Sequence, residues 1–143
     1  MTRLTRRLPL FALLPVCLLA LTACGKEKDK EGLGKACDAA QPALTTAPTL
    51  PGAFPRANGM VFTAVKKTGP TTVATGYIDQ TIGPAHDAFT NAVKGASGYS
   101  ITKNEQDAAD AEVTFKDAGY SGQVKLVQEC KTRTTVTITI RPA

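Results

Sequence analysis

The first 23 residues set the limits on what this chain can fold into. Arg3, Arg6 and Arg7 are followed by a run of uncharged, mostly apolar residues, 8–23, and no acidic residue precedes position 24. A short basic region, an apolar stretch of this length and small residues at its end are typical of an export signal that is removed. The run is shorter than the roughly 20 residues that span a bilayer as a helix. We therefore expect residues 1–23 to be a signal peptide and the fold to come from the chain after it.

The end of this signal, Leu21-Thr22-Ala23-Cys24, resembles the lipobox of bacterial lipoproteins. In that family the cysteine is linked to diacylglycerol, the signal is cut before it, and the new amine is often acylated, for example with palmitate. An ordinary signal-peptidase site needs small residues at −3 and −1, and cleavage after Ala23 would place Leu21 at −3. The resemblance implies lipidation of Cys24 and a lipid anchor on the extracytoplasmic face of the cell membrane.

Two further resemblances concern the export route and the source of the chain. Thr5-Arg6-Arg7-Leu8 is similar to a twin-arginine export motif, although Pro9 follows where that family has an aromatic residue or Leu. Both the twin-arginine and the general secretory route therefore stay open. The segment 61–142 looks like that of small exported actinobacterial lipoproteins, a group without an assigned role.

The net charge of the chain argues against a nucleic-acid partner once the charge of the signal is subtracted. The chain carries +5, and the loss of three arginines with the signal lowers this to +2. Residues 24–35 mix both signs of charge with three glycines, so they predict a flexible tether. The remaining chain is close to neutral, which together with export disfavours a nucleic-acid partner.

The four cysteines leave a single possible disulfide. Cys17 lies within the signal and Cys24 is expected to carry lipid, so Cys37 and Cys130 remain. Exported proteins keep disulfides, and a bond between these two would stabilise the fold by about 4–5 kcal/mol on a chain-entropy model. The alternative, two free or metal-binding thiols, lacks a CxxC spacing or a nearby His.

Residues 36–58 differ in composition from the chain that follows. They are rich in Ala, Thr and Pro, which favours an extended backbone and prevents a long helix. From residue 59 to 143 the pattern becomes regular. Met60–Lys67 and Thr71–Ile78 are β-rich runs separated by a Gly-Pro turn, so they predict a hairpin.

A helix is predicted over Pro84–Lys94, where apolar residues recur at helical spacing (Ala85, Phe89, Ala92 and Val93). Later runs such as Ala111–Lys116 and Thr132–Arg141 alternate apolar and polar residues, as strands do. Asn104–Asp110 and Asp117–Gly122 are interpreted as polar connections. The pattern predicts an α+β domain at 59–143, with a single antiparallel sheet packed by one helix in the order ββαβββ.

Few residues in this chain are suited to catalysis. His86 is the only imidazole, and its position on the predicted helix favours a structural role. Ser121 lies in Gly119-Tyr120-Ser121-Gly122-Gln123, which does not match the GxSxG nucleophile motif because Gln123 stands in place of the last glycine. Phosphate loops, HExxH motifs and dinucleotide glycine fingerprints do not occur. We expect no catalytic residues, no cofactor and no metal.

Two polar surfaces are candidate binding sites. One is a strand face that carries Arg133, Thr135, Thr137, Thr139 and Arg141, an arrangement found on glycan- or ice-binding surfaces and also on ordinary solvated strands. The other is the acidic segment 104–112, which offers oxygen ligands for Ca²⁺ but lacks the EF-hand spacing. The sequence leaves both open.

The sequence therefore predicts a non-catalytic binding or accessory module of the cell envelope. Its expected partners are the membrane, through the anchor on Cys24, and an envelope protein, peptidoglycan or a small ligand. One alternative is an inhibitor that presents Asp117–Gly122 to a secreted enzyme. A second is a small hydrolase that uses Ser121 or His86. The oligomeric state is left open.

Overall fold

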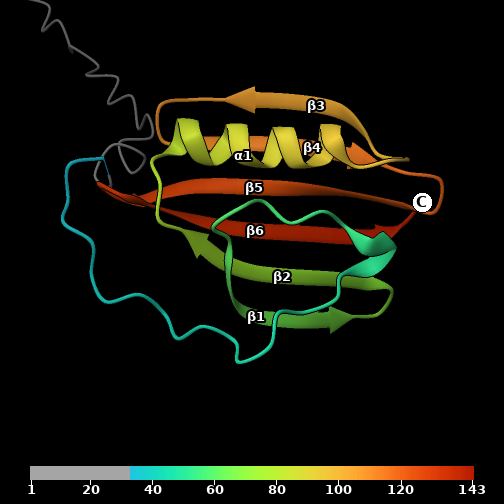
Figure 1. Cartoon of the computed structure of the whole chain (residues 1–143), viewed down its shortest axis with the longest axis horizontal. Helices are drawn as coiled ribbons and strands as arrows, with labels where there is room; N and C mark the ends of the chain where they lie inside the picture. Colours follow the sequence, from blue (N-terminus) through green and yellow to red (C-terminus); the bar gives the residue numbers. More distant parts are fainter. Residues whose placement is uncertain (1–32) are drawn as a thin grey trace, which may run out of the picture.

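The computed structural model describes residues 33–143 (Figure 1). The predicted signal, the lipobox with Cys24 and most of the predicted tether lie outside the described residues. No helix in the described range has both the length and the apolar character that crossing a membrane requires.

The fold is one antiparallel sheet of six strands with one helix, in the spatial order β1-β2-β6-β5-β4-β3 (Figure 1). The elements are η1 (Pro51–Ala53), β1 (Val61–Thr68), β2 (Thr71–Ile78), α1 (Ile82–Gly95), β3 (Ser100–Gln106), β4 (Asp110–Lys116), β5 (Tyr120–Cys130) and β6 (Arg133–Pro142). The predicted α+β class, with one sheet and one helix, is confirmed. Four strands follow the helix, one more than the order ββαβββ counts.

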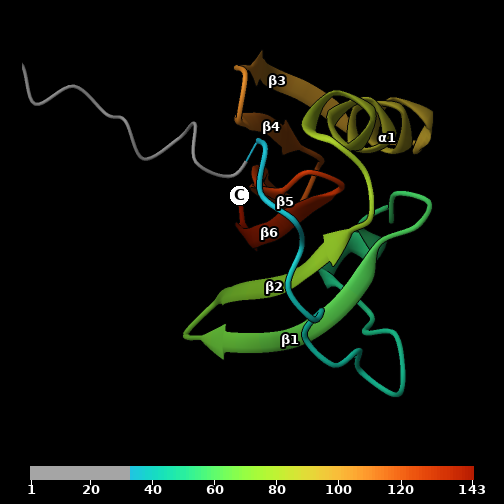
Figure 2. The same ribbon diagram turned by 90° about the vertical axis from the view of Figure 1, so that its left-hand side faces the viewer.

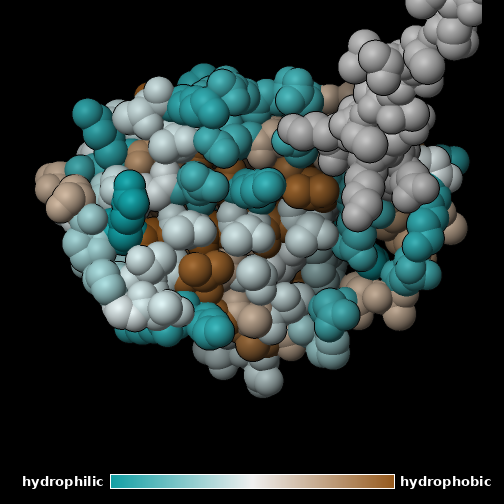
Figure 3. Space-filling view, turned by 180° about the vertical axis from the view of Figure 1, so that it is seen from behind, coloured by the Kyte–Doolittle hydropathy of each residue, from teal (hydrophilic) through white to brown (hydrophobic). Residues whose placement is uncertain are grey.

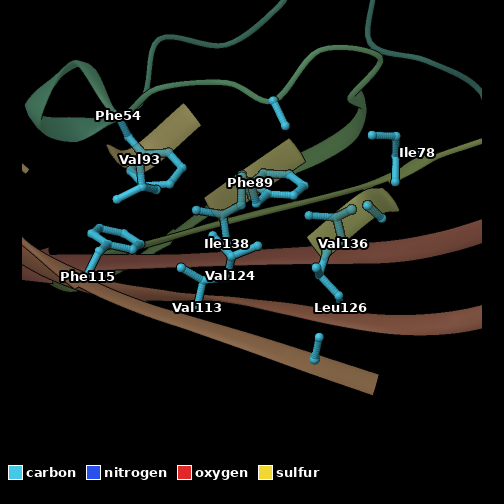
Figure 4. Packing of buried hydrophobic residues seen from close by; sticks show 14 of the residues in the cluster. Phe54, Ile78, Phe89, Val93, Val113, Phe115, Val124, Leu126, Val136 and Ile138 are labelled. Atoms are coloured by element: carbon cyan, nitrogen blue, oxygen red, sulfur yellow. The ribbon is translucent and has the colours of Figure 1, made fainter. Parts of the chain in front are cut away.

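Two segments cover the front face of the sheet, the face seen in Figure 1. Helix α1 packs over β3, β4 and β5, and the segment 50–57 lies beside it on the same face (Figures 1 and 2). Leu50, Phe54 and Ala57 of this segment are buried in the core. The ring of Phe54 lies 4.4 Å from that of Phe115, and both reach the cluster around α1 (Figure 4). The last part of the Pro-rich segment, residues 50–57, thus contributes to the hydrophobic core.

Two predicted connections turn out to be shorter than expected. Strand β3 continues to Gln106, so the connection to β4 is only 107–109, closed by a hydrogen bond from the amide of Asp107 to the carbonyl of Asp110 (2.8 Å). Residues 102–106 are all exposed at the sheet edge, so no alternation of apolar residues marks them as a strand. Strand β5 likewise begins at Tyr120, inside the predicted turn Asp117–Gly122, because the Asp117 side chain closes the turn within three residues.

Candidate functional site

A segment that we call the strap, residues 35–44, fastens the N-terminal part of the described chain to the sheet. Cys37 is joined to Cys130 by a disulfide with the Cα atoms 5.1 Å apart, which confirms the predicted pairing. The amide of Lys131 donates to the carbonyl of Lys35 (2.9 Å). At the other end the amide of Leu44 donates to the carbonyl of Phe62 (2.7 Å). The strap therefore runs from the β5–β6 hairpin to the edge strand β1 (Figure 1).

Between these attachments the strap forms one wall of a groove of about 260 Å³ on the back face of the sheet, the face opposite α1. We call this the strap groove. Strap residues Ala39 and Gln41 line one side of it. The sheet contributes residues from four strands: Thr63, Thr75, Gly76, Tyr77, Glu129, Arg133 and Thr135. Tyr77 and Thr135 are cross-strand neighbours, as are Val127 of β5 and Thr135, so the lining belongs to one continuous patch.

Arg133 holds the sheet and the strap together in this groove. Its Nε donates to Asp79 Oδ1 and its Nη1 to the carbonyl of Asp38, both at 2.9 Å. The guanidinium also lies 4.9 Å from the centroid of the Tyr77 ring, within the range of a cation–π interaction. The Asp79 carboxylate raises the pKa of Arg133. The Arg133 side chain is only 12% exposed, so its charge serves the fold and is compensated by Asp79.

Glu129 is the charged group of the groove that is left to a ligand. Its Oε2 accepts a hydrogen bond from Thr135 Oγ1 (3.2 Å), and within residues 33–143 it forms no ion pair. The hydroxyl of Thr75 and the amide of Gln41 supply further donors and acceptors. The hydroxyl of Thr63 donates to the carbonyl of Thr75 (3.3 Å), so it offers a ligand only its acceptor capacity. The Glu129 carboxylate disfavours an anionic ligand, because the charge of Arg133 in the same groove is already compensated by Asp79. Carboxylate, amide and hydroxyl groups around an aromatic ring suit a neutral ligand rich in hydroxyl groups.

The strand face singled out in the sequence belongs partly to this groove. Arg133 and Thr135 line it, whereas Thr137 and Thr139 continue along the back face and Arg141 lies exposed at the far end of β6. Figure 3 shows the back face, where residues of intermediate hydropathy lie between hydrophilic margins. Val127, the cross-strand neighbour of Thr135 on this face, is 40% exposed.

The two residues considered for hydrolysis lie on opposite faces of the sheet. His86 is buried on α1, at the front, where its Nε2 lies 2.7 Å from Asn104 Oδ1. Ser121 is paired with Arg141 in the register of β5 and β6, on the back face. A serine nucleophile and its histidine base need to be within hydrogen-bond distance of each other. These two cannot form such a pair.

The acidic segment 104–112 is part of the β3–β4 hairpin. Lys103 Nζ lies 2.8 Å from Glu105 and 3.5 Å from Glu112, two cross-strand neighbours, and Glu105 is the main cause of a raised Lys103 pKa. The Asn104 side chain instead points to the front face of the sheet, where it contacts His86 of α1. In the described part of the chain no group of three or more His, Cys, Asp or Glu side chains could hold a metal ion.

The predicted Asp117–Gly122 loop is anchored rather than free. Asp117 Oδ1 accepts hydrogen bonds from the amides of Gly119 (2.7 Å) and Tyr120 (2.5 Å), and the first of these is the main cause of the lowered Asp117 pKa. The neighbouring Tyr99 donates to the carbonyl of Gly52 (2.8 Å). Burial, and next the negative charge of Asp117, raise the pKa of Tyr99 to about 12.

Several residues of the strap groove escaped the sequence analysis. Strand alternation places Tyr77 and Glu129 on the polar face of the sheet, but it does not say that β2 lies next to β6. Nor does any local pattern show that Gln41 passes over that face. Two signals pointed to the right region: the strand face with Arg133 and Thr135, and the disulfide prediction, which ties the strap to β5.

No family model matches this chain, and no curated protein does.

Proposed function

We propose that this protein is a lipid-anchored extracytoplasmic module without catalytic activity, which binds a neutral, hydroxyl-rich envelope glycan such as that of peptidoglycan in the strap groove. The observation that carries the proposal is the lining of this groove. Glu129 offers a carboxylate without an ion-pair partner in the described chain, next to the hydroxyl group of Thr75, the amide of Gln41 and the Tyr77 ring. Sugar hydroxyls donate to carboxylates and exchange hydrogen bonds with hydroxyl and amide groups.

The position of the groove in the chain agrees with an anchor on Cys24. Ala39, the first groove residue, follows Cys24 by fifteen positions, and an extended chain spans at most about 3.5 Å per residue. The groove would therefore stay within about 50 Å of the membrane surface. A disulfide-bonded fold is also what an extracytoplasmic location allows.

Binding of a soluble glycan tests the proposed site. The probe is a chitotetraose titration of the whole chain in detergent, with retention on purified peptidoglycan as a second readout. Glu129→Gln keeps the shape of the side chain and removes its charge, so we expect at least a ten-fold loss of affinity. Glu105→Gln is the matched control on the far edge strand, and it should bind as the unmodified chain does. Equal binding by both variants, or no glycan binding at all, would refute the site.

The anchor is tested separately from the groove. Cys24→Ala should abolish incorporation of radiolabelled fatty acid and release the protein from the membrane fraction. Cys37→Ala is the control, because it removes a cysteine that is bonded within the fold. Fatty-acid labelling that persists in Cys24→Ala would contradict the anchor.

A further inference from the structure

A second cavity, of about 380 Å³, lies on the front face between α1 and the segment that precedes β1. We call it the helix pocket. Arg56 and Asn58 form one wall, and Ala88, Asn91 and Ala92 of α1 form the other. Figures 1 and 2 both show these two segments side by side over the front of the sheet. The helix pocket and the strap groove are therefore on opposite faces of the molecule.

Core residues hold both walls of the helix pocket in place. Ala57, between Arg56 and Asn58, is only 5% exposed, and its carbonyl accepts a hydrogen bond from the amide of Met60 (3.2 Å). On the helix, Phe89 is fully buried between the wall residues Ala88 and Asn91. The backbone of both walls is thus fixed by packing, and the polar side chains project from fixed positions into the cavity.

The polar side chains of the pocket have hydrogen-bonding capacity that the fold does not use. Across residues 33–143, no ion pair and no side-chain hydrogen bond joins Arg56, Asn58 or Asn91 to another residue. No acidic residue lines the cavity. Asp87, next to Ala88 in the chain, lies beside His86 with 3.7 Å between Oδ1 and Nδ1.

The side chains that line the helix pocket match the chemical groups at the C-terminus of a peptide. The planar guanidinium of Arg56 can donate two parallel hydrogen bonds to a carboxylate. Asn58 and Asn91 each present a donor and an acceptor, as a peptide amide requires. Ala88 and Ala92 lie one helical turn apart and provide a shallow apolar floor that suits a methyl-sized side chain. Arg56 is the single cation of the lining, and one positive charge suits a monoanionic carboxylate better than a phosphate dianion.

We propose that the helix pocket binds the C-terminal carboxylate of a peptide whose last residue is small. Arg56 binds the carboxylate, Asn58 and Asn91 bind the last peptide group, and the side chain rests on Ala88 and Ala92. This site is independent of glycan binding in the strap groove, and it gives the module a second ligand on its other face.

An NMR titration of the whole chain in detergent with acetyl-Gly-Ala tests this proposal. Shifts should be confined to residues 56–58 and 88–92, and acetyl-Gly-Ala amide should bind at least ten-fold more weakly because it lacks the carboxylate. Arg56→Gln should weaken binding at least ten-fold. Ala92→Leu, which fills the floor without a change of charge, should do the same. Arg141→Gln, an exposed arginine at the far end of β6, is the matched control and should leave binding unchanged.

Three results would overturn the proposal. The first is equal affinity for the acid and the amide. The second is a tighter, competing interaction with inorganic phosphate that Arg56→Gln abolishes, which would make the pocket a phosphate site. The third is no shift at these residues. Glu129→Gln should not affect the peptide titration, so failure of the strap groove and failure of the helix pocket are distinguishable.

Discussion

The hydroxyl of Tyr99 donates a 2.8 Å hydrogen bond to the carbonyl of Gly52, a residue 47 positions earlier in the chain. Gly52 lies in the left-handed region, at φ 65°, in the short turn η1. This contact joins the loop before β3 to the Pro-rich segment, whose Phe54 packs edge-on against the same Tyr99 ring with the centroids 5.8 Å apart. The segment before the first strand is in this way locked into the fold.

Gly52→Ala should therefore destabilise the protein more than the backbone angle alone explains. A methyl group at Gly52 would lie 2.6 Å from Tyr99 Oη and 2.9 Å from Asp117 Oδ2. Gly98→Ala is the control, since Gly98 also has a positive φ, 87°, but has open space around it. We expect a loss of about 1 kcal/mol for Gly98→Ala and about 2–3 kcal/mol for Gly52→Ala in urea unfolding. Equal losses would mean that the contacts around Gly52 do not matter.

Tyr99 should make the stability of the protein pH-dependent in the alkaline range. Its pKa is raised to about 12 in the folded protein, so between pH 10 and pH 12 the folded state holds a proton that the unfolded state releases. Below pH 10 this group should not change the unfolding free energy. Between pH 10 and pH 12 the unfolding free energy should fall as the pH rises. Tyrosinate absorbance should show a late step near pH 12, which Tyr99→Phe removes. A titration of the Tyr99→Phe variant that keeps this late step would assign it to another tyrosine.

The close approach of β5 to β6 depends on Gly122. A methyl group there would lie 2.1 Å from the backbone oxygen of Thr139 and 2.7 Å from Phe115 Cζ, and the backbone cannot yield as a flexible side chain would. Gly122→Ala should cost about 2–3 kcal/mol of unfolding free energy. Gly119→Ala, three residues away and with no atom within 4 Å, should change it by less than about 0.5 kcal/mol. A Gly122→Ala protein as stable as the control would contradict the described register.

Loss of the Cys37–Cys130 bond should lower stability substantially, because the bond joins residues 93 positions apart. On the chain-entropy model the loss is about 4–5 kcal/mol, less any strain in the native bond. Cys37→Ser with Cys130→Ser should unfold at a lower temperature than the unmodified chain. Reducing agent should lower the melting temperature of the unmodified chain and leave that of the double variant unchanged. A reductant effect on the double variant would point to another cause.

Local sequence patterns predicted most of the regular structure. Val136, Ile138 and Ile140 alternate along β6 and are buried, as their spacing indicates. The start of the helix is less accessible to such reasoning. It begins at Ile82, two residues before Pro84, and the amide of Ile82 donates to the Gln128 side chain (2.6 Å), a partner 46 positions away. No local signal can show that contact.

The binding surfaces were less predictable than the elements, because each depends on segments that are distant in the chain. Proline density removes periodicity from 36–58, so the burial of Phe54 and the position of Arg56 beside α1 have no sequence signature. The strap groove needs β2 next to β6 and the strap across both. Arg133 was singled out from its strand face, but its partner Asp79 and the Tyr77 ring come from β2 and its end.

The most direct test of the account is photocrosslinking in intact cells from the strap groove. A photoreactive residue in place of Gln41, on the wall of the groove, should give an adduct that contains envelope glycan. The same residue in place of Lys66, exposed on β1 and outside the groove, should give none. A glycan adduct from both positions, or an adduct from Gln41 that contains only protein, would contradict glycan binding in the strap groove.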